Sequence, residues 1–147
     1  MTNKAASGQG RLWARVEESF QKQAFLSLIG AQLRSVEEGR VEISCRRRPD
    51  LGQQQGLLHG GVVATIGDVT CGYTALTMMP EGCEVLTAEF KIHLLRPVMA
   101  EEIVAVGQVV KAGRSLIITE AEIRDAESGT MIAKMLGTMV PTSQDRL

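Results

Sequence analysis

The sequence predicts an α+β fold in which one curved antiparallel β-sheet wraps around a long central helix. Two observations predict it. Several segments show the two-residue alternation of strands, and one long segment, residues 62–76, carries apolar side chains around much of its circumference. A helix of this kind needs cover on several sides, which a curved sheet provides. The 147 residues, 44% of them hydrophobic and 22% charged, suffice for one compact domain.

The first third of the chain predicts a tail, a helix and a hairpin. Residues 1–10 are small and polar and lack the apolar core of a signal peptide, so we predict a flexible tail before a single domain of residues 11–147. Apolar residues at helical spacing predict a helix over 12–29. Two alternating segments, 31–36 and 40–46, flank a Glu-Glu-Gly turn and predict a β-hairpin.

The remaining two thirds predict the central helix and the rest of the sheet. A loop rich in Gly and Gln, 51–58, leads into the apolar helix, which spans about residues 60–78 and ends at a Met-Pro-Glu-Gly sequence. Alternating segments bounded by turn residues then predict four strands, at 85–94, 102–111, 115–125 and 130–140.

The strongest functional signal is His59-Gly60-Gly61, which opens the central helix. First-turn N–H groups have no acceptor within a helix and lie at the positive end of its dipole, so they can bind a developing oxyanion. Asp68 lies on the third turn and is the only charged residue between Gly61 and Met79. Because an unpaired carboxylate is costly to bury, Asp68 is either paired for structure or has a chemical task.

Three separated motifs resemble those of the hotdog-fold acyl-CoA thioesterases, in their phenylacetate-degradation (PaaI-like) branch. The resemblance spans residues 25–140. Its motifs, in the order of the family, are Gly56-x-x-His59-Gly60-Gly61 with Asp68, Leu86-Thr-Ala-Glu-Phe-Lys-Ile-His-Leu-Leu-Arg-Pro97, and Gly129-x-x-Ile132-Ala133-x-x-x-Gly137-Thr138.

The resemblance implies a hotdog fold, acyl-CoA hydrolysis and assembly. In this family two subunits pair sheet to sheet and the active sites lie between them, so a homodimer or a homotetramer built from two dimers is expected. Coenzyme A is part of the substrate, and neither a separate cofactor nor a metal is expected. By the resemblance Gly60 donates to the oxyanion. Asp68 acts as general base, or as a nucleophile that forms an anhydride, and the sequence leaves both routes open.

The resemblance also suggests supporting residues. The family has a carboxamide six positions before His59, where this chain has Gln53; Gln54 could serve if the loop shifts by one residue. Thr87 matches a hydroxyl that the family places opposite the acid from the partner subunit, although it is equally typical of an ordinary strand. His59 could itself act as a base, but we favour a role in orienting the loop and the carbonyl.

Substrate contacts are predicted from charge and position. Gly61 is expected at the substrate carbonyl. For the phosphates of coenzyme A we predict a loop N–H, cations and a hydroxyl, supplied by Arg96, Lys111, Gly113, Arg114 and Ser115. The acyl pocket is expected between the central helix and three apolar residues of the first helix, Phe25, Leu28 and Ile29.

Composition argues against several other functions. A net charge of −1 and 3% aromatic residues do not favour nucleic-acid binding, and no segment suits a membrane span. The three cysteines show no metal-binding or disulfide spacing, which favours a reducing, cytoplasmic location. Two alternative functions on the same fold remain: a hydratase or dehydratase, and a non-catalytic acyl-CoA-binding protein.

Overall fold

A computed structural model describes residues 8–146. Its elements, in chain order, are α1 (Gly8–Gln21), α2 (Ala24–Ile29), β1 (Ala31–Glu37), β2 (Arg40–Arg46), the 3-10 turn η1 (Pro49–Leu51), α3 (Gly60–Leu76), β3 (Cys83–Leu94), β4 (Glu102–Ala112), β5 (Ile117–Asp125), β6 (Met131–Ser143) and the 3-10 turn η2 (Gln144–Arg146).

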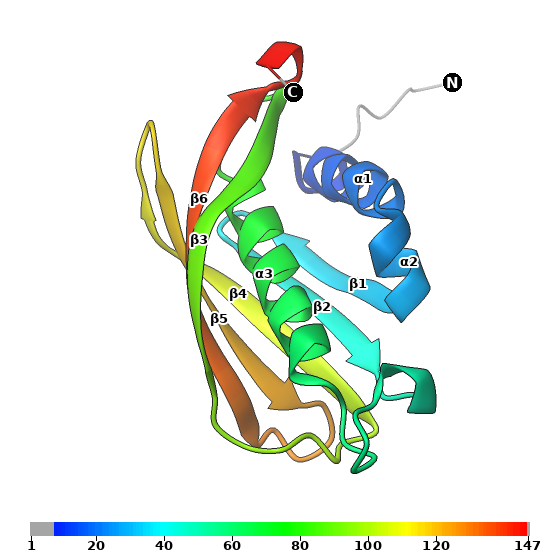
Figure 1. The fold of residues 1–147 in the computed structure, drawn as a ribbon. Coiled ribbons are helices and arrows are strands. Elements are labelled where there is room, and N and C mark those ends of the chain that lie inside the picture. The colour runs from blue at the N-terminus through cyan, green and yellow to red at the C-terminus, as the bar shows by residue number, and fades with distance from the viewer. Residues whose placement is uncertain (1–7, 147) are drawn as a thin grey trace, which may run out of the picture.

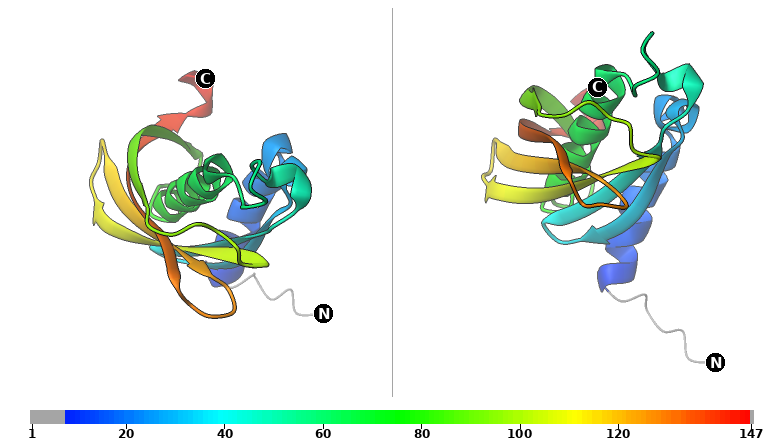
Figure 2. Two further views of the ribbon diagram at one scale, coloured as in Figure 1. Left: turned by 60° about the horizontal axis from the view of Figure 1, so that its bottom comes forward. Right: turned by 90° about the horizontal axis from the view of Figure 1, so that it is seen from below.

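The six strands form one antiparallel sheet in the order β1-β2-β4-β5-β6-β3. The sheet curves around α3, which lies along its concave face, while α1 and α2 lie beside β1 (Figures 1 and 2). This confirms the predicted α+β class and the helix wrapped by a sheet. No helix in the described part of the chain is long and apolar enough to cross a membrane.

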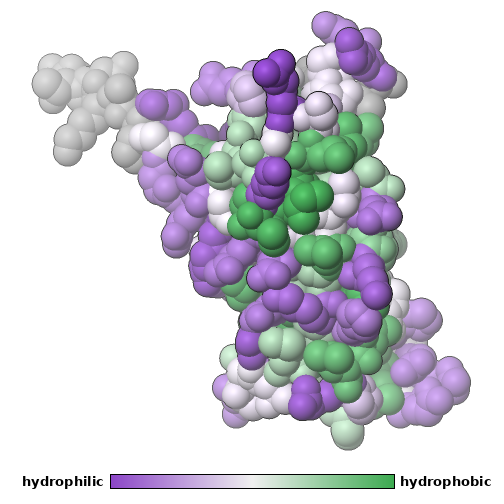
Figure 3. Space-filling model, turned by 90° about the vertical axis from the view of Figure 1, so that its left-hand side faces the viewer, coloured by the Kyte–Doolittle hydropathy of each residue, from purple (hydrophilic) through white to green (hydrophobic). Residues whose placement is uncertain are grey.

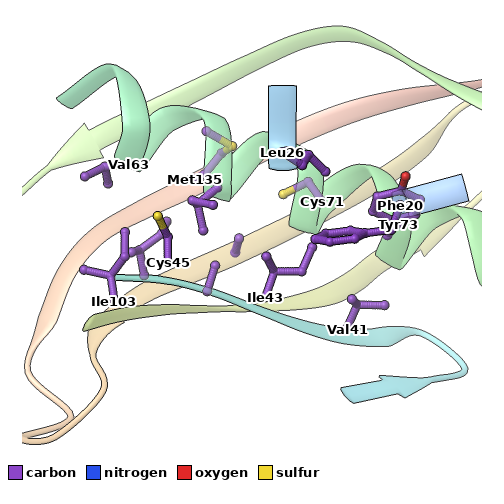
Figure 4. Packing of buried hydrophobic residues seen from close by; sticks show 14 of the residues in the cluster. Phe20, Leu26, Val41, Ile43, Cys45, Val63, Cys71, Tyr73, Ile103 and Met135 are labelled. Atoms are coloured by element: carbon purple, nitrogen blue, oxygen red, sulfur yellow. The ribbon is translucent and has the colours of Figure 1, made fainter. Parts of the chain in front are cut away.

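The core lies between α3 and the concave face of the sheet (Figure 4). Ile66, Cys71 and Ala75 of α3 are fully buried, as are Ile43 of β2 and Met135 of β6. Val63, Ile66 and Thr70 of α3, which are buried at helical spacing, face strand residues that are buried in alternation, such as Ile103 and Ala105 of β4. Burial on this scale fixes the helix relative to the sheet and so fixes where its one carboxylate points.

The N-terminal helical segment differs from the prediction. The chain bends after Gln21, so that α1 and α2 replace one helix, and the Gln23 side chain donates to the Tyr73 hydroxyl at 2.7 Å at this corner. Gly30 ends α2 with a φ of 74°, which suits glycine. Gly8 to Gly10 already belong to α1, and the rest of the predicted tail lies outside the described residues.

The strand boundaries also shift slightly. β5 begins at Ile117 rather than at residue 115, and the central helix ends at Leu76 rather than at residue 78. β6 continues to Ser143, because Pro141 and Ser143 pair with the first residues of β3. Local composition ends the predicted strand at residue 140, but the long partner strand extends it.

The two edges of the sheet differ in how they are covered. β1 packs against α1, whereas β3 is a twelve-residue edge strand whose side chains are mostly exposed. The side of the molecule bearing β3, β5 and β6 mixes apolar with charged side chains (Figure 3). Exposed Leu136 of β6, for example, lies two positions from Lys134, which bonds to Glu120 and Glu122.

Candidate active site

The carboxylate of Asp68 and the hydroxyl of Thr87 form the centre of the site. Thr87 Oγ1 donates to Asp68 Oδ1 at 2.8 Å. Asp68 comes from the middle of α3 and Thr87 from β3, where the pairing with β6 shifts register between Thr87 and Glu89. An irregularity of this kind changes the direction of side chains along a strand. Thr87 and Phe90 are three residues apart, yet both pair with residues on the inner face of β6, Met139 and Gly137.

This contact corrects one prediction. Thr87 was expected to approach the acid from a partner subunit, but it bonds to Asp68 of its own chain. The resemblance located the hydroxyl correctly at Thr87 but assigned it to the wrong chain. The register of β3 against β6 decides that, and it depends on residues far apart in sequence.

Burial dominates the electrostatics of Asp68. Loss of hydration raises the pKa of its carboxyl above the ordinary value, and the Thr87 hydrogen bond opposes that shift. Asp68 forms no ion pair with any residue between 8 and 146. A desolvated carboxylate without a counter-ion is more basic and more reactive than one in water, as a general base or a nucleophile requires.

The start of α3 leaves a single N–H group free. His59 is the N-cap, and its Nδ1 accepts from the Gly61 N–H at 2.8 Å. The His59 carbonyl accepts from Val62 and Val63 at 3.0 and 3.4 Å. The Gly60 N–H has no acceptor among the described residues. Gly60 is therefore the donor that can bind an oxyanion, whereas the Gly61 N–H is already used by the cap.

His59 is exposed, and its cap bond bears on its role. Because Nδ1 accepts a hydrogen bond, the neutral ring carries its proton on Nε2 and donates from that atom. This geometry favours the orienting role over the general-base role. The tautomer follows from the hydrogen bond, and the role of His59 stays a prediction.

The glutamine loop lies at the same end of α3. Gln53 is half-buried in a turn where its N–H donates to Leu57 O and its carbonyl accepts from Gly56, both at 2.9 Å. Gln54 and Gln55 are exposed. The His59 N–H donates to Leu51 O at 2.9 Å, which ties this loop to the helix start. Gln53, His59 and Gly60 thus belong to one structural unit, apart from Asp68.

The two halves of the predicted chemistry are separated along α3. Gly60 and Asp68 are eight residues apart, which at the rise of an α-helix is about 12 Å. A thioester carbonyl must lie within hydrogen-bond range of the oxyanion donor while its carbon is close to the base or nucleophile. One chain therefore cannot place its own Gly60 and Asp68 on the same carbonyl.

Asp68 and Thr87 line a cavity of about 640 Å³. Its walls are α3, β3 and one face of the N-terminal helical segment, including Arg15, Ser19 and Gln23. Sequence reasoning missed this wall, because polar residues four apart on a helix are typical of a solvated face. The Tyr73 hydroxyl, 3.1 Å from Ser19 Oγ, holds that face against α3.

The predicted apolar wall is wrong. Phe25 is 54% exposed and Leu28 is 70% exposed, while Ile29 is buried in the core, and none of them lines the cavity with Asp68. The bend after Gln21 turns α2 away from the cavity and leaves α1 beside it (Figure 1). A continuous helix was the assumption behind that prediction.

The predicted phosphate contacts do not form one group. Arg96 donates to Met131 O at 2.7 Å and follows β3, whose last residue, Leu94, lies near Gly60. Gly113 and Arg114 line a second cavity, of about 530 Å³, beside Met78 at the opposite end of α3. Lys111 and Ser115 flank them on the exposed β4–β5 hairpin. Within one chain a single coenzyme A cannot contact both groups with its phosphates.

Comparison with known proteins identifies the family. Residues 55–132, more than half of the chain, match the Thioesterase superfamily. The chain belongs to this superfamily. A thioesterase family protein from Silicibacter pomeroyi is 35% identical over 90% of this chain and 98% of its own, with a TM-score of 0.86. This confirms the resemblance inferred from the three motifs and makes the chain a hydrolase of the thioesterase superfamily.

Other similar proteins are named as esterases or share the fold. A predicted esterase of Saccharolobus solfataricus is 29% identical to this chain over 124 residues, which are 84% of this chain and 87% of that protein. The PaaI protein of E. coli, from the phenylacetic acid degradation operon, has the same fold, with a TM-score of 0.84 at 18% identity over 92% of this chain and 96% of its own. The hotdog fold is thereby confirmed.

Proposed function

We propose that this thioesterase hydrolyses acyl-CoA thioesters to a free acid and coenzyme A. The observation that carries the proposal is the half-buried, partly desolvated Asp68 carboxylate, which is bonded to Thr87 and lines a cavity large enough for an acyl group. The free N–H of Gly60 supplies the second requirement, a donor for the oxygen on which negative charge develops.

The reaction follows from these groups. Asp68 takes a proton from water as the water attacks the thioester carbon, or attacks that carbon itself and forms an anhydride that water then opens. The Gly60 N–H stabilises the tetrahedral oxyanion, and coenzyme A leaves as a thiolate that takes the proton held by Asp68 or, in the anhydride route, a proton from water. Thr87 holds Asp68 in place, and Gln53 is proposed to hold the carbonyl or the water. His59 keeps the first turn of α3 in shape.

The complete site is proposed to combine two chains, because Gly60 and Asp68 of one chain are about 12 Å apart. β3 is an edge strand whose outer side pairs with no other strand among residues 8–146, and two copies of it can pair about a two-fold axis. Leu94 lies beside Gly60, and Thr87 lies beside Asp68. Antiparallel pairing centred between Phe90 and Lys91 sets Leu94 of one chain opposite Thr87 of the other. Each Gly60 then approaches the Asp68 of the partner.

The same assembly accounts for the separated cations. Arg96 lies at one end of α3, and the hairpin residues Lys111, Gly113, Arg114 and Ser115 lie at the other. In an antiparallel pair of chains, opposite ends of α3 come from different subunits on one side of the assembly. We therefore propose that the phosphates of one coenzyme A are held by residues of both chains.

Thiol release from a panel of acyl-CoA thioesters tests the function. The wild-type protein should release free coenzyme A, and Asp68→Asn should lose at least about 10²-fold in turnover, the scale of general base catalysis. Asn has nearly the same shape as Asp and removes a half-buried charge, so the melting temperature of the variant should not fall. Acyl-CoA binding without thiol release would instead identify a non-catalytic binding protein, and hydration of an enoyl-CoA would identify a hydratase.

Mixing two inactive variants tests the shared site. Asp68→Asn removes the acid, and Gly60→Pro removes the N–H donor at the first helical position, where proline is well tolerated. After unfolding and refolding together, hybrid dimers should contain one intact site and regain activity. Mixing Asp68→Asn with Thr87→Ala should restore nothing, because these residues belong to the same half-site. Equal recovery in both mixtures would refute the arrangement.

A further inference from the structure

Gly72 lies one helical turn after Asp68 in α3 and lines the same cavity. Residues four apart share a helix face, so the Cα of Gly72 faces the space next to the carboxylate. Glycine in a helix interior is destabilising relative to alanine, because it loses more conformational freedom on folding. Its presence at this position therefore calls for a compensating reason.

Packing supplies that reason for the other glycines of the core but not for Gly72. A Cβ at Gly67 would lie 3.0 Å from Met135 Cε, and one at Gly107 would lie 2.2 Å from Thr74 Oγ1. A Cβ at Gly137 would lie 2.8 Å from Met139 Cε. At Gly72 the one contact within 4 Å among residues 8–146, apart from its two chain neighbours and the helix backbone, would be Val85 Cγ1 at 3.9 Å, an ordinary distance.

We propose that Gly72 keeps open the acyl-binding space beside Asp68 and so sets the size of the acyl group that is hydrolysed. This inference rests on the proposed acyl-CoA hydrolysis and adds the substrate class: acyl groups considerably larger than acetyl. Such a group extends from the thioester carbon between Gly72 of α3 and Val85 of β3, towards α1. A side chain at position 72 would occupy the space that this group needs.

A graded series at position 72 tests the proposal. We would measure kcat/KM for acetyl-, hexanoyl- and phenylacetyl-CoA in wild type, Gly72→Ala and Gly72→Val. The ratio of hexanoyl-CoA to acetyl-CoA should fall at least about tenfold in Gly72→Val and less in Gly72→Ala, as expected when methyl groups fill a hydrophobic pocket. Gly72→Ala should also raise Tm, since alanine favours the helix, so a loss of selectivity would not reflect poorer folding.

A second-site variant provides the control. Val85→Ala removes the side chain nearest to the new methyl groups, so the double variant Gly72→Val with Val85→Ala should recover much of the lost selectivity. An equal fall for all three substrates, or no change in the ratio, would overturn the proposal. Dissociation of Gly72→Val in sedimentation would also overturn it, because the open space would then belong to a subunit contact. Absence of hydrolysis by the wild-type protein would instead refute the proposed function.

Discussion

At the scale of single residues, the site depends on an acceptor that is already hydrogen-bonded, Asp68, and on a donor without a partner among the described residues, the Gly60 N–H. Asp68 accepts a bond from Thr87 within its own chain, which lowers the pKa that burial raises. Gly60 has an N–H without an acceptor among residues 8–146, so its bond is available to a ligand. The Asp68 carboxylate is oriented by a hydrogen bond that it already accepts. The Gly60 N–H can donate to a ligand because it has no partner among the described residues.

Replacing the Thr87 hydroxyl should change the pH dependence of hydrolysis. The carboxylate form of Asp68 is active as base or nucleophile, so kcat/KM should fall as pH drops through its pKa. Thr87 stabilises that carboxylate; Thr87→Val therefore raises the pKa further and moves the acid limb of the pH profile to higher pH. Steady-state kinetics from pH 4 to 8 would show this, and an unmoved acid limb would mean that another group limits the rate.

Two substitutions at Gly60 should separate the effect of the N–H from that of the side chain. Gly60→Ala keeps the donor and adds a Cβ about 3.0 Å from Leu94 Cδ1, the end of an exposed side chain that can move. Gly60→Pro adds similar bulk and removes the donor. Turnover of the proline variant should be about 10²-fold below that of the alanine variant, as for loss of one oxyanion donor. Equal turnover of the two variants would place the oxyanion elsewhere.

At the scale of elements, the N-terminal helix is part of the site rather than a covering for β1 alone. Arg15 of α1 donates to the carbonyls of Met79 and Pro80 at 2.8 Å and of Cys83 at 3.1 Å. These bonds fasten α1 to the segment between α3 and β3. Because α1 forms one wall of the cavity beside Asp68, its attachment determines the shape of that cavity.

Removing the Arg15 contacts should loosen α1. We expect Arg15→Gln to lower the free energy of unfolding by about 1–2 kcal/mol, since a charged donor to three carbonyls is lost from a partly exposed position. Hydrogen exchange should accelerate in α1 more than in α3. Lys22→Ala is the matched control on the same segment: its ion pair with Glu18 is exposed, so the free energy of unfolding should change much less than in Arg15→Gln. Similar losses in both variants would contradict the role of Arg15.

At the scale of the whole molecule, the uncovered edge at β3 and the divided site point to the same assembly. β3 extends along α3 from Thr87, which contacts Asp68, to Leu94, which lies beside Gly60. Pairing of two such edges continues the sheet and brings together the groups that one chain keeps apart. Assembly and activity are therefore proposed to be coupled.

That coupling should be visible in concentration dependence. If folding is linked to pairing, Tm should rise with protein concentration, since mass action favours the associated folded state. Specific activity should fall on dilution over the same range in which sedimentation shows dissociation. A monomer that retains full specific activity would contradict the shared site.

The fold class, most strand positions and the position of the carboxylate could be predicted from the sequence. The alternation of β2 predicts its bounds at Arg40 and Arg46, and the apolar helix predicts α3 from Gly60. These features depend on the period of side chains along a few neighbouring residues, which the sequence displays directly. Three separated motifs, of which the one with His59 and Asp68 lies at and within a single helix, likewise indicated the family, because each motif is a short local pattern.

The contacts between the groups of the site could not be predicted in this way and follow from the packing of the chain. The register of β3 against β6 places the Thr87 hydroxyl within hydrogen-bond distance of Asp68 in the same chain. The imidazole of His59 accepts from the Gly61 N–H, so that the Gly60 N–H stays available to a ligand. The bend after Gln21 replaces the predicted apolar wall with a face of α1. Each of these outcomes depends on how distant segments pack or on which local hydrogen bond forms, and neither is encoded in the period of a single segment.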